Sequence, residues 1–270
     1  MEIGKFHVLG TLGSGAHSTI LHVRRADDAR HYALKVVKIA SAGERKFLEQ
    51  ARHEFAVAQK LDHPNLVKIY ALEAQRDWLF RIRKIHLLIE YVPGKTLDTL
   101  QQLPISRLLE VFEKVAAGLV HMHRRSIFHA DVKPNNIILN DRDGEVKILD
   151  YGLAWIKGED KGRVQGTPEY MAPEQVSQRV VNERTDIYNL GATMYRMLTW
   201  HLPPNALKAA RDSNLIDAQT WKLAFRPIQD FNPNAPAELC ELVHRCLSFS
   251  ANDRPARMVD VQEALAQIAR

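Results

Sequence analysis

Three polar side chains with oxygen donors fall within twenty residues of one another near the middle of the chain. They are Asp131, Asn136 and Asp150, and Lys133 lies among them. Carboxylate and amide oxygens are the ligands that Mg²⁺ takes in proteins, and a carboxylate can also accept the proton of an attacking hydroxyl. A lysine beside them can neutralise charge on a migrating phosphate. This group therefore has the chemistry that phosphoryl transfer needs.

A candidate nucleotide-binding region precedes this group. Residues 6–12 and 18–24 are apolar, β-rich runs on either side of a turn with two glycines, Gly13 and Gly15, and they predict a hairpin. Because glycine has no Cβ, such a turn lets the backbone come close to a polyphosphate. By itself the turn is a weak signal, since an ordinary hairpin has the same composition.

Hydrophobic periodicity predicts two regions of different character. The first is a five-stranded antiparallel sheet with one helix, and its further elements are expected at residues 31–39, 66–73 and 85–92 for strands and 44–61 for the helix. The second is mainly helical, with helices expected at 105–124, 183–199, 236–247 and 257–269. The sequence thus predicts an α+β protein of one domain, residues 1–270, with an N-lobe at 1–89, a hinge at 90–94 and a C-lobe at 95–270.

Composition narrows the class and compartment of the protein. A chain of 270 residues that is 46% hydrophobic can bury a large core without disulfides. Its two cysteines, Cys240 and Cys246, form no metal-binding pair, so we expect reduced thiols of a cytoplasmic protein. No run of about 18 apolar residues exists, and we expect no membrane segment.

The net charge of +5 is concentrated in the first third of the chain. Residues 1–93 hold 15 basic against 10 acidic residues, whereas residues 94–270 are balanced. The basic residues are scattered and match no nucleic-acid-binding motif, so a solvated surface is favoured over a nucleic-acid partner. Some of this charge can help to hold a polyphosphate.

In order and spacing the motifs resemble the protein kinase family, in its serine/threonine branch, from about Phe6 to about Ile268. The matching segments are the glycine hairpin, Tyr32-Ala33-Leu34-Lys35, His129-Ala130-Asp131 with Asn136, Asp150-Tyr151-Gly152 and Ala172-Pro173-Glu174. The resemblance implies the bilobal protein kinase fold, ATP and Mg²⁺ (or Mn²⁺) as cofactors, and transfer of the γ-phosphate to Ser or Thr hydroxyls of protein substrates. The sequence carries no signal for the oligomeric state.

The resemblance also implies a role for each matching residue. Asp131 would be the catalytic base beside Lys133, while Asn136 and Asp150 would hold the metal. A larger set of residues would bind the nucleotide. In it, Glu54 would orient Lys35, backbone groups of the hinge would bond the edge of the adenine, and Ile89 would lie behind the adenine pocket. The set comprises Leu12, Gly13, Gly15, Ile20, Ala33, Lys35, Glu54, Ile89, Glu90, Val92 and Ile138.

The chain departs from the family pattern in ways that bear on regulation. Ser18 replaces the third glycine of the loop, and Ala130 replaces the arginine that pairs with a phosphate on the activation segment. That segment, Leu153 to Gly166, has no Ser, Thr or Tyr. We therefore hypothesise that activity needs no phosphorylation there. Thr167 is expected to hydrogen-bond Asp131 and Lys133 instead.

The same comparison yields four expectations about scaffold residues. Glu174 and Arg254 should form a buried ion pair, and Asp186 should bond the backbone of the catalytic loop. His129 should pack and bond backbone, and the hydroxyl of Tyr151 should find a partner if it is buried.

Parts of the sequence also fit two other functions. Ala130 is closer to the glycine of aminoglycoside-type small-molecule phosphotransferases, but Ala172-Pro173-Glu174 favours a peptide site. A catalytically weak pseudokinase or scaffold usually lacks a catalytic Lys, Asp or Asn, and this chain has them all. Lys133 and the segment Gly166–Tyr170 look like the serine/threonine type.

Overall fold

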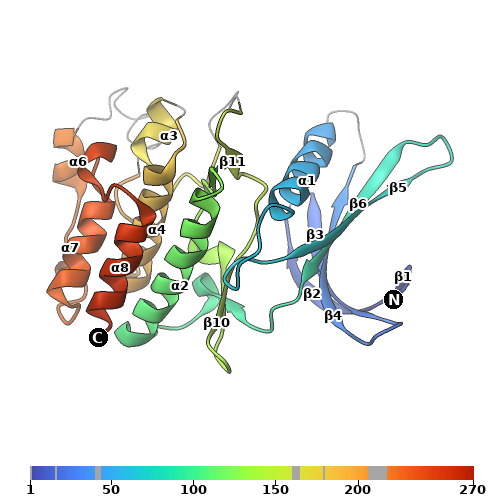
Figure 1. The fold of residues 1–270 in the computed structure, drawn as a ribbon, viewed down its shortest axis with the longest axis horizontal. Coiled ribbons are helices and arrows are strands. Elements are labelled where there is room, and N and C mark those ends of the chain that lie inside the picture. The colour runs from blue at the N-terminus through green and yellow to red at the C-terminus, as the bar shows by residue number, and fades with distance from the viewer. Residues whose placement is uncertain (1, 16, 40–43, 160–164, 179, 206–217) are drawn as a thin grey trace. The chain divides into compact units, whose positions relative to one another are not determined.

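The computed structural model describes residues 2–15, 17–39, 44–159, 165–178, 180–205 and 218–270. The chain divides into two compact units, whose elements are labelled in Figure 1. Unit 1 comprises residues 1–62, 66–93 and 150–152, and unit 2 comprises residues 63–65, 94–149 and 153–270. Unit 1 is built on a sheet and unit 2 mainly on helices, so the predicted α+β class is confirmed.

Unit 1 contains an antiparallel sheet in the order β1-β2-β3-β4-β6-β5. Its strands are β1 (Glu2–Ile3), β2 (Phe6–Ser14), β3 (Ser18–Arg25), β4 (His31–Lys38), β5 (Ile69–Arg76) and β6 (Ile82–Glu90). Five of them are the expected strands, and the two-residue β1 is an addition at the edge. The glycine hairpin is present, because Gly13 pairs with Ile20 and Ser14 with Thr19.

The β5–β6 hairpin runs farther than the apolar pattern indicated. The strands were expected at 66–73 and 85–92, but the turn between them lies at Asp77–Arg81. The side chain of Asp77 accepts hydrogen bonds from the backbone N–H groups of Leu79 and Arg81 and fixes this turn. The strands extend toward this turn through residues 74–76 and 83–84, which are exposed and mostly polar and therefore carry no apolar pattern.

Helix α1 (Arg45–Ala58) contacts β4, β5 and β6. Its buried side chains are Ala51, Glu54, Val57 and Ala58, which share one face of the helix. The helix ends three residues before the expected limit of 44–61, because Lys60 and Leu61 continue in turns bonded to Val57 and Ala58. An acidic residue thus lies among the apolar residues that face the sheet.

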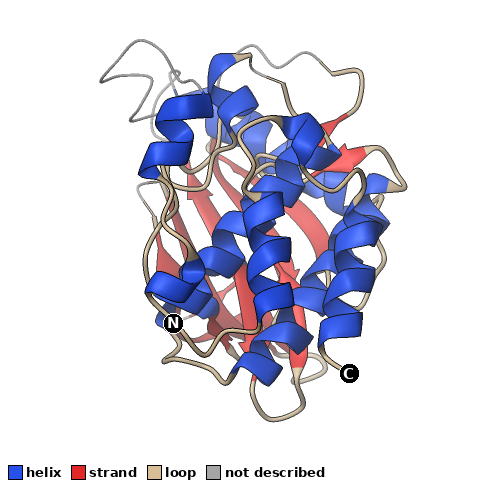
Figure 2. Cartoon of the chain, turned by 90° about the vertical axis from the view of Figure 1, so that its left-hand side faces the viewer, coloured by secondary structure: helices blue, strands red, loops and turns tan. Residues whose placement is uncertain are grey.

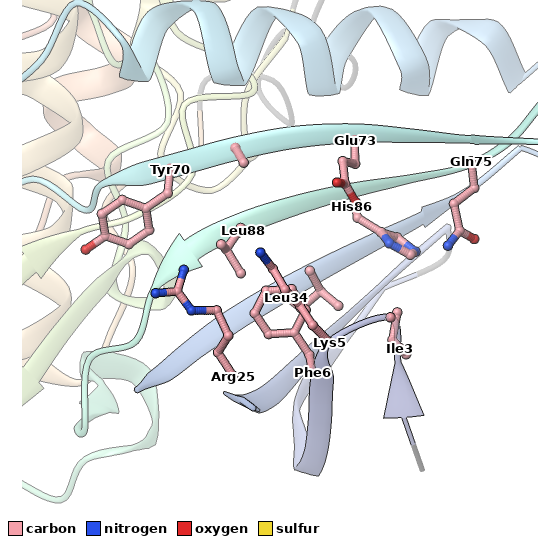
Figure 3. A pocket seen from close by; sticks show the side chains of 12 residues that line it. Ile3, Lys5, Phe6, Arg25, Leu34, Tyr70, Glu73, Gln75, His86 and Leu88 are labelled. Atoms are coloured by element: carbon pink, nitrogen blue, oxygen red, sulfur yellow. The ribbon is translucent and has the colours of Figure 1, made fainter. Parts of the chain in front are cut away.

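The face of the sheet that bears Leu34 is hollowed into a pocket of about 600 Å³. Figure 3 shows Arg25 and Tyr70 at one end of this pocket, and Glu73, His86 and Gln75 toward the other. Successive side chains of a strand point to opposite faces, so Lys35 lies on the other face from Leu34. The pocket is therefore separate from the predicted nucleotide-binding residues.

Unit 2 is built from helices that stand side by side in Figure 2. They are α2 (Ile105–His123), α3 (Pro173–Ser177), α4 (Glu183–Thr199), α6 (Ala218–Ala224), α7 (Ala237–Cys246) and α8 (Met258–Ile268). Short strands accompany them: β7 (Lys95–Thr96), β8 (Ile127–Phe128), β9 (Ile137–Asn140), β10 (Glu145–Ile148) and β11 (Trp155–Ile156). The four expected long helices are confirmed, whereas α3, α6 and the short strands were not predicted.

Helix α4 lies at the centre of unit 2 and contacts α2, α7 and α8. The side chain of Asn182 caps the first turn of α4 by accepting the N–H of Arg184, and the hydroxyl of Thr185 accepts the N–H of Asn182. A Cβ at Gly191 would lie 2.7 Å from Cys246 Cβ, so glycine is needed where α4 meets α7. Cys240 and Cys246 are buried and unpaired, as expected.

In the part of the chain that the structure describes, no helix is long and apolar enough to cross a membrane.

The predicted buried ion pair of unit 2 is confirmed. Arg254 bonds both carboxylate oxygens of Glu174, at 2.8 and 2.9 Å, and its guanidinium also donates to the carbonyls of Arg184, Ser248 and Phe249. Arg254 is 3% exposed. A guanidinium with this many acceptors ties α3 to the loops beside α8.

We predict that Arg254→Ala lowers the free energy of unfolding by about 3–5 kcal/mol, because it leaves the Glu174 carboxylate buried without its cation. Denaturant titration of the variant would measure this loss. The matched control is Arg257→Ala, which breaks an exposed pair with Asp260 and should cost less than about 1 kcal/mol. Equal losses in the two variants would contradict the assignment.

Candidate active site

The loop between β8 and β9 carries Asp131, and the carboxylate of Asp186 fixes its backbone. Asp186 Oδ2 accepts the N–H of His129 at 2.8 Å, and Oδ1 accepts the N–H of Ala130 at 2.7 Å. Ala130 has a φ of 64°, a left-handed conformation that costs energy for a residue with a Cβ. The two hydrogen bonds hold the loop in this strained conformation, and the expected role of Asp186 is confirmed.

A buried histidine supports Asp186. His123, at the end of α2, places Nε2 at 2.7 Å from Asp186 Oδ2 and Nδ1 at 3.3 Å from Glu183 Oε1. Burial opposes the imidazolium charge, but the hydrogen bond to Asp186 and the attraction of both carboxylates outweigh it and raise the pKa of His123 to about 9. The pKa of Asp186 is lowered, since these bonds and those of the loop outweigh its own desolvation.

His129 acts through backbone contacts, as expected. Its Nε2 lies 3.0 Å from the carbonyl of Leu149, and its Nδ1 accepts the N–H of Asp131 at 3.4 Å. Leu149 in turn donates its N–H to the carbonyl of Asn136. The residue before Asp150 is thereby bonded to both ends of the loop that carries Asp131.

The carboxylate of Asp131 is 6% exposed and surrounded by donors. Thr167 donates its backbone N–H to Oδ1 at 2.8 Å, Lys133 Nζ lies 2.9 Å from Oδ2, and Asn136 Nδ2 lies 3.2 Å from the same oxygen. Lys133 also donates to the hydroxyl of Thr167. The expected contacts of Thr167 with Asp131 and Lys133 are confirmed, so both candidate catalytic side chains contact the same residue.

Asn136 is oriented by its amide nitrogen. Nδ2 donates to the backbone carbonyl of Asp131 at 2.9 Å as well as to the Asp131 carboxylate. Both bonds use the nitrogen, so Oδ1 is the atom available to a cation. An amide oxygen fixed beside a carboxylate fits the oxygen-donor set that Mg²⁺ takes.

Lys35, Glu54 and Asp150 lie together in unit 1. Lys35 Nζ donates to Glu54 Oε2 at 2.7 Å and lies 3.8 Å from Asp150 Oδ1. Burial opposes the ammonium charge, but the attraction of both carboxylates outweighs it and raises the pKa of Lys35. Glu54 is 2% exposed, and burial raises its pKa to about 7 against the pull of Lys35. The predicted Lys35–Glu54 pair is confirmed, and Lys35 stays protonated.

The segment Asp150-Tyr151-Gly152 is fixed by several local contacts. Asp150 has a φ of 60°, and its Oδ1 accepts the N–H of Gly152 at 3.0 Å. Tyr151 is fully buried, and its hydroxyl donates to the carbonyl of Val67 at 2.9 Å, which confirms the expected partner. A Cβ at Gly152 would lie 2.9 Å from Gln50 Nε2 and 3.0 Å from Asp150 Oδ1. Glycine at position 152 thus leaves room for the side chains of Gln50 and Asp150.

The remaining nucleotide-binding candidates divide between the units. Unit 1 holds Leu12, Gly13, Gly15, Ile20, Ala33, Ile89, Glu90 and Val92, and unit 2 holds Ile138. Gly15 donates its N–H to the carbonyl of Ser18, which closes the hairpin. The N–H of Glu90 is taken by the carbonyl of Lys68, so any bond from Glu90 to a nucleotide base would use its carbonyl. Their role in nucleotide binding stays a prediction.

Sequence reasoning missed three buried side chains that bond the residues around Asp131: His123 bonds Asp186, Gln175 bonds the carbonyl of Ala130, and Asn189 bonds the carbonyl of Tyr170. His123 gives no motif, because its partners lie about sixty residues away. Gln175 follows the Ala172-Pro173-Glu174 match directly, and Asn189 lies one turn after Asp186, so their position beside known motifs was the available signal. The activation segment lies partly outside the described residues, which omit 160–164.

Comparison with known proteins identifies the family. A family model described as protein kinase domain matches residues 6–267. The serine/threonine-protein kinase PrkC of Bacillus subtilis is 29% identical over 208 residues, and the serine/threonine-protein kinase pkn2 of Myxococcus xanthus is 29% identical over 277 residues. These alignments cover 74% and 97% of this chain. The chain belongs to the protein kinase family.

The chain spans only part of these relatives. The alignments cover 31% of PrkC and 32% of pkn2. The cAMP-dependent protein kinase type 3 of Saccharomyces cerevisiae is 29% identical over 254 residues, which are 92% of this chain and 60% of that protein. The similarity therefore concerns only a part of each relative.

We predict that unfolding stability falls as the pH rises from about 6.5 to about 9. The pKa of His123 is higher in the folded protein, so its stabilising contribution is complete below the unfolded pKa of about 6.5 and is lost as the pH passes the folded value, at most about 3 kcal/mol in all. Denaturant titrations across this range would measure the slope.

The variant His123→Gln should remove most of that slope while still donating a hydrogen bond to Asp186. His121→Gln, on the same helix but outside the cluster, is the matched control and should keep the slope. A wild-type slope retained in His123→Gln would show that another group causes it.

Proposed function

We propose that this domain transfers the γ-phosphate of ATP to Ser or Thr hydroxyls of protein substrates. The observation that carries the proposal is the environment of Asp131, a buried carboxylate held between the N–H of Thr167 and the ammonium of Lys133. Such a carboxylate can orient a hydroxyl and accept its proton, and the ammonium beside it can neutralise the phosphate that the hydroxyl attacks. Similarity to serine/threonine kinases supports this choice of substrate.

Each unit supplies part of the chemistry in this proposal. In unit 1, the protonated Lys35, oriented by Glu54, would bind the α- and β-phosphates. Asp150 in unit 1 and the Oδ1 of Asn136 in unit 2 each present an oxygen suited to Mg²⁺ or Mn²⁺, and such an ion when bound would supply positive charge to the phosphates. The donor set fits this ion, because both residues present hard oxygens and both are held by local hydrogen bonds.

We further propose that this activity needs no phosphate on the segment Leu153 to Gly166. The backbone of Ala130 is held by the carboxylate of Asp186 and by the amide of Gln175, so its conformation does not depend on an arginine side chain. Thr167 already contacts Asp131 and Lys133 through its N–H and hydroxyl.

Both buried cysteines are unpaired, which suits a cytoplasmic enzyme.

We predict that Asp131→Asn lowers kcat by about 10²–10⁴-fold, because an amide cannot accept the hydroxyl proton. The measurement is phosphate incorporation into a generic protein substrate, with mass-spectrometric mapping of the modified residues. A Mg²⁺-dependent thermal shift with ATP should be retained in the variant. Absence of both turnover and that shift in the wild type would favour a scaffold protein, and transfer to aminoglycosides alone would favour a small-molecule phosphotransferase.

We predict that enzyme freed of all phosphate by a phosphatase transfers phosphate from the first turnover without a lag. The variant Thr167→Val serves a separate purpose, since it removes the hydroxyl that binds Lys133 and should lower activity whether or not phosphate is present. A lag that ends with phosphate on Thr167 or a nearby residue would contradict the proposal.

A further inference from the structure

Within unit 2, Asp131 is joined to the segment Gly166–Ala172 by a chain of hydrogen bonds that uses both backbone and side-chain atoms. Its Oδ1 accepts the N–H of Thr167, and the carbonyl of Thr167 accepts the N–H of Tyr170 at 2.9 Å. The carbonyl of Tyr170 then accepts a hydrogen bond from Asn189 Nδ2 at 2.6 Å. The segment from Gly166 to Ala172 is thereby attached at one end to the candidate base and at the other to α4.

Two side-chain amides close this chain into a ring. Asn189 Nδ2 also donates to Gln175 Oε1 at 3.2 Å, and the same oxygen accepts the N–H of Ala172 at 2.9 Å. Gln175 Nε2 donates to the carbonyl of Ala130 at 3.1 Å. Since Ala130 directly precedes Asp131 in the chain, the peptide bond between them closes the ring.

The donors and acceptors of the ring fix the orientation of the Gln175 amide. Exchanging its nitrogen and oxygen would set a donor against the N–H of Ala172 and an acceptor against the carbonyl of Ala130. Both amides are buried, at 2% exposure for Gln175 and 1% for Asn189, so water does not compete for these bonds.

The amide of Asn189 has one oxygen that none of the described residues satisfies, and this cost indicates that the hydrogen bonds of its nitrogen have a role. Its Oδ1 is buried and has no hydrogen-bond partner within the described part of the chain. A buried acceptor without a partner costs stability, and an apolar residue of the same size would avoid that cost. The two hydrogen bonds made by Nδ2 are what the asparagine supplies in return.

We propose that Gln175 and Asn189 are positioning residues that hold the segment from Gly166 to Ala172 against the catalytic loop, in place of an arginine–phosphate pair. The proposal rests on the proposed kinase function and names the device that makes it independent of phosphorylation. Because both amides are neutral, the link is permanent. It cannot be switched by adding or removing a phosphate.

Gln175 also accepts the N–H of Ala172 at the start of α3, so a merely structural role must be separated from a positioning role. The variant Gln175→Met removes all hydrogen bonds of the amide while keeping its length. We expect kcat to fall by about tenfold or more and the KM for ATP to stay within about twofold, because the nucleotide contacts of unit 1 are unchanged.

The matched control is Ser177→Ala on the same helix. It removes the hydrogen bond from the Ser177 hydroxyl to the carbonyl of Pro173, which lies outside the ring, and should leave kcat unchanged. Amide hydrogen exchange at Thr167 and Ala172 should accelerate by about tenfold in Gln175→Met, with exchange in α2 and α8 unchanged. Acceleration throughout unit 2, or none, would overturn the proposal.

A second variant, Gln175→Glu, keeps the acceptor for Ala172 but can donate to the carbonyl of Ala130 only when its carboxyl is protonated. Burial raises the pKa of such a carboxyl, so kcat of the variant relative to wild type should rise as the pH is lowered from about 8 to about 6. A ratio that is flat with pH at the wild-type level would contradict the proposal. If neither variant folds, Gln175 is scaffold and the proposal is wrong.

The outcomes separate this proposal from the proposed function. Wild type that transfers no phosphate in either the phosphorylated or the dephosphorylated state would overturn the function, whatever the exchange data show. Wild type that is active only when phosphorylated would overturn the phosphate-independent link. Active wild type with variants of unchanged kcat and exchange would overturn only the role of Gln175 and Asn189.

Discussion

The carboxylate of Asp186 is the contact on which the candidate active site depends. It is fully buried, yet it holds two successive backbone N–H groups of the catalytic loop and the imidazole of His123. Desolvating a carboxylate is costly unless it is paired and hydrogen-bonded, and here all of its donors are supplied by α2 and the loop itself. The loop can therefore keep Ala130 in a left-handed conformation that its sequence alone would not adopt. The position of Asp131 follows from that backbone.

Unit 1 also buries a carboxylate, that of Glu54, but here a lysine rather than backbone N–H groups pairs with it. Glu54 lies on the apolar face of α1, where burial favours its neutral form, while Lys35 on β4 favours its charged form. The pair is thus coupled, and Asp150 adds a second carboxylate within 3.8 Å of the ammonium. A lysine between two carboxylates keeps its charge, and a cation on a sheet face is suited to phosphate. The pocket of Figure 3, on the other face, has none of these residues.

The sequence predicted those features that local pattern or family motif determines. The five main strands, the long helices and the pairs Lys35–Glu54 and Glu174–Arg254 were anticipated, because periodicity and motif order report them directly. The ends of β5 and β6 were misplaced because residues 74–76 and 83–84 are exposed and mostly polar, so the apolar pattern stops before the strands do. His123 was missed because its contacts join helices far apart in sequence, which no periodic pattern encodes. Asn189 was missed because the role of a polar residue in a buried helix depends on its hydrogen-bond partners, which the sequence does not show.

The replacement of arginine by Ala130 has a physical consequence beyond the loss of a charge. An arginine in this loop carries a cation that needs an anion, and a phosphate can supply it only after the segment has been phosphorylated. A methyl group needs no partner, and it leaves the backbone carbonyl of the residue as the point of attachment for Gln175. Neutral buried hydrogen bonds vary little with salt or pH, whereas an exposed ion pair is screened by salt. A kinase built in this way would be limited by the amount of enzyme and by access to substrate, and its control would have to act at those steps.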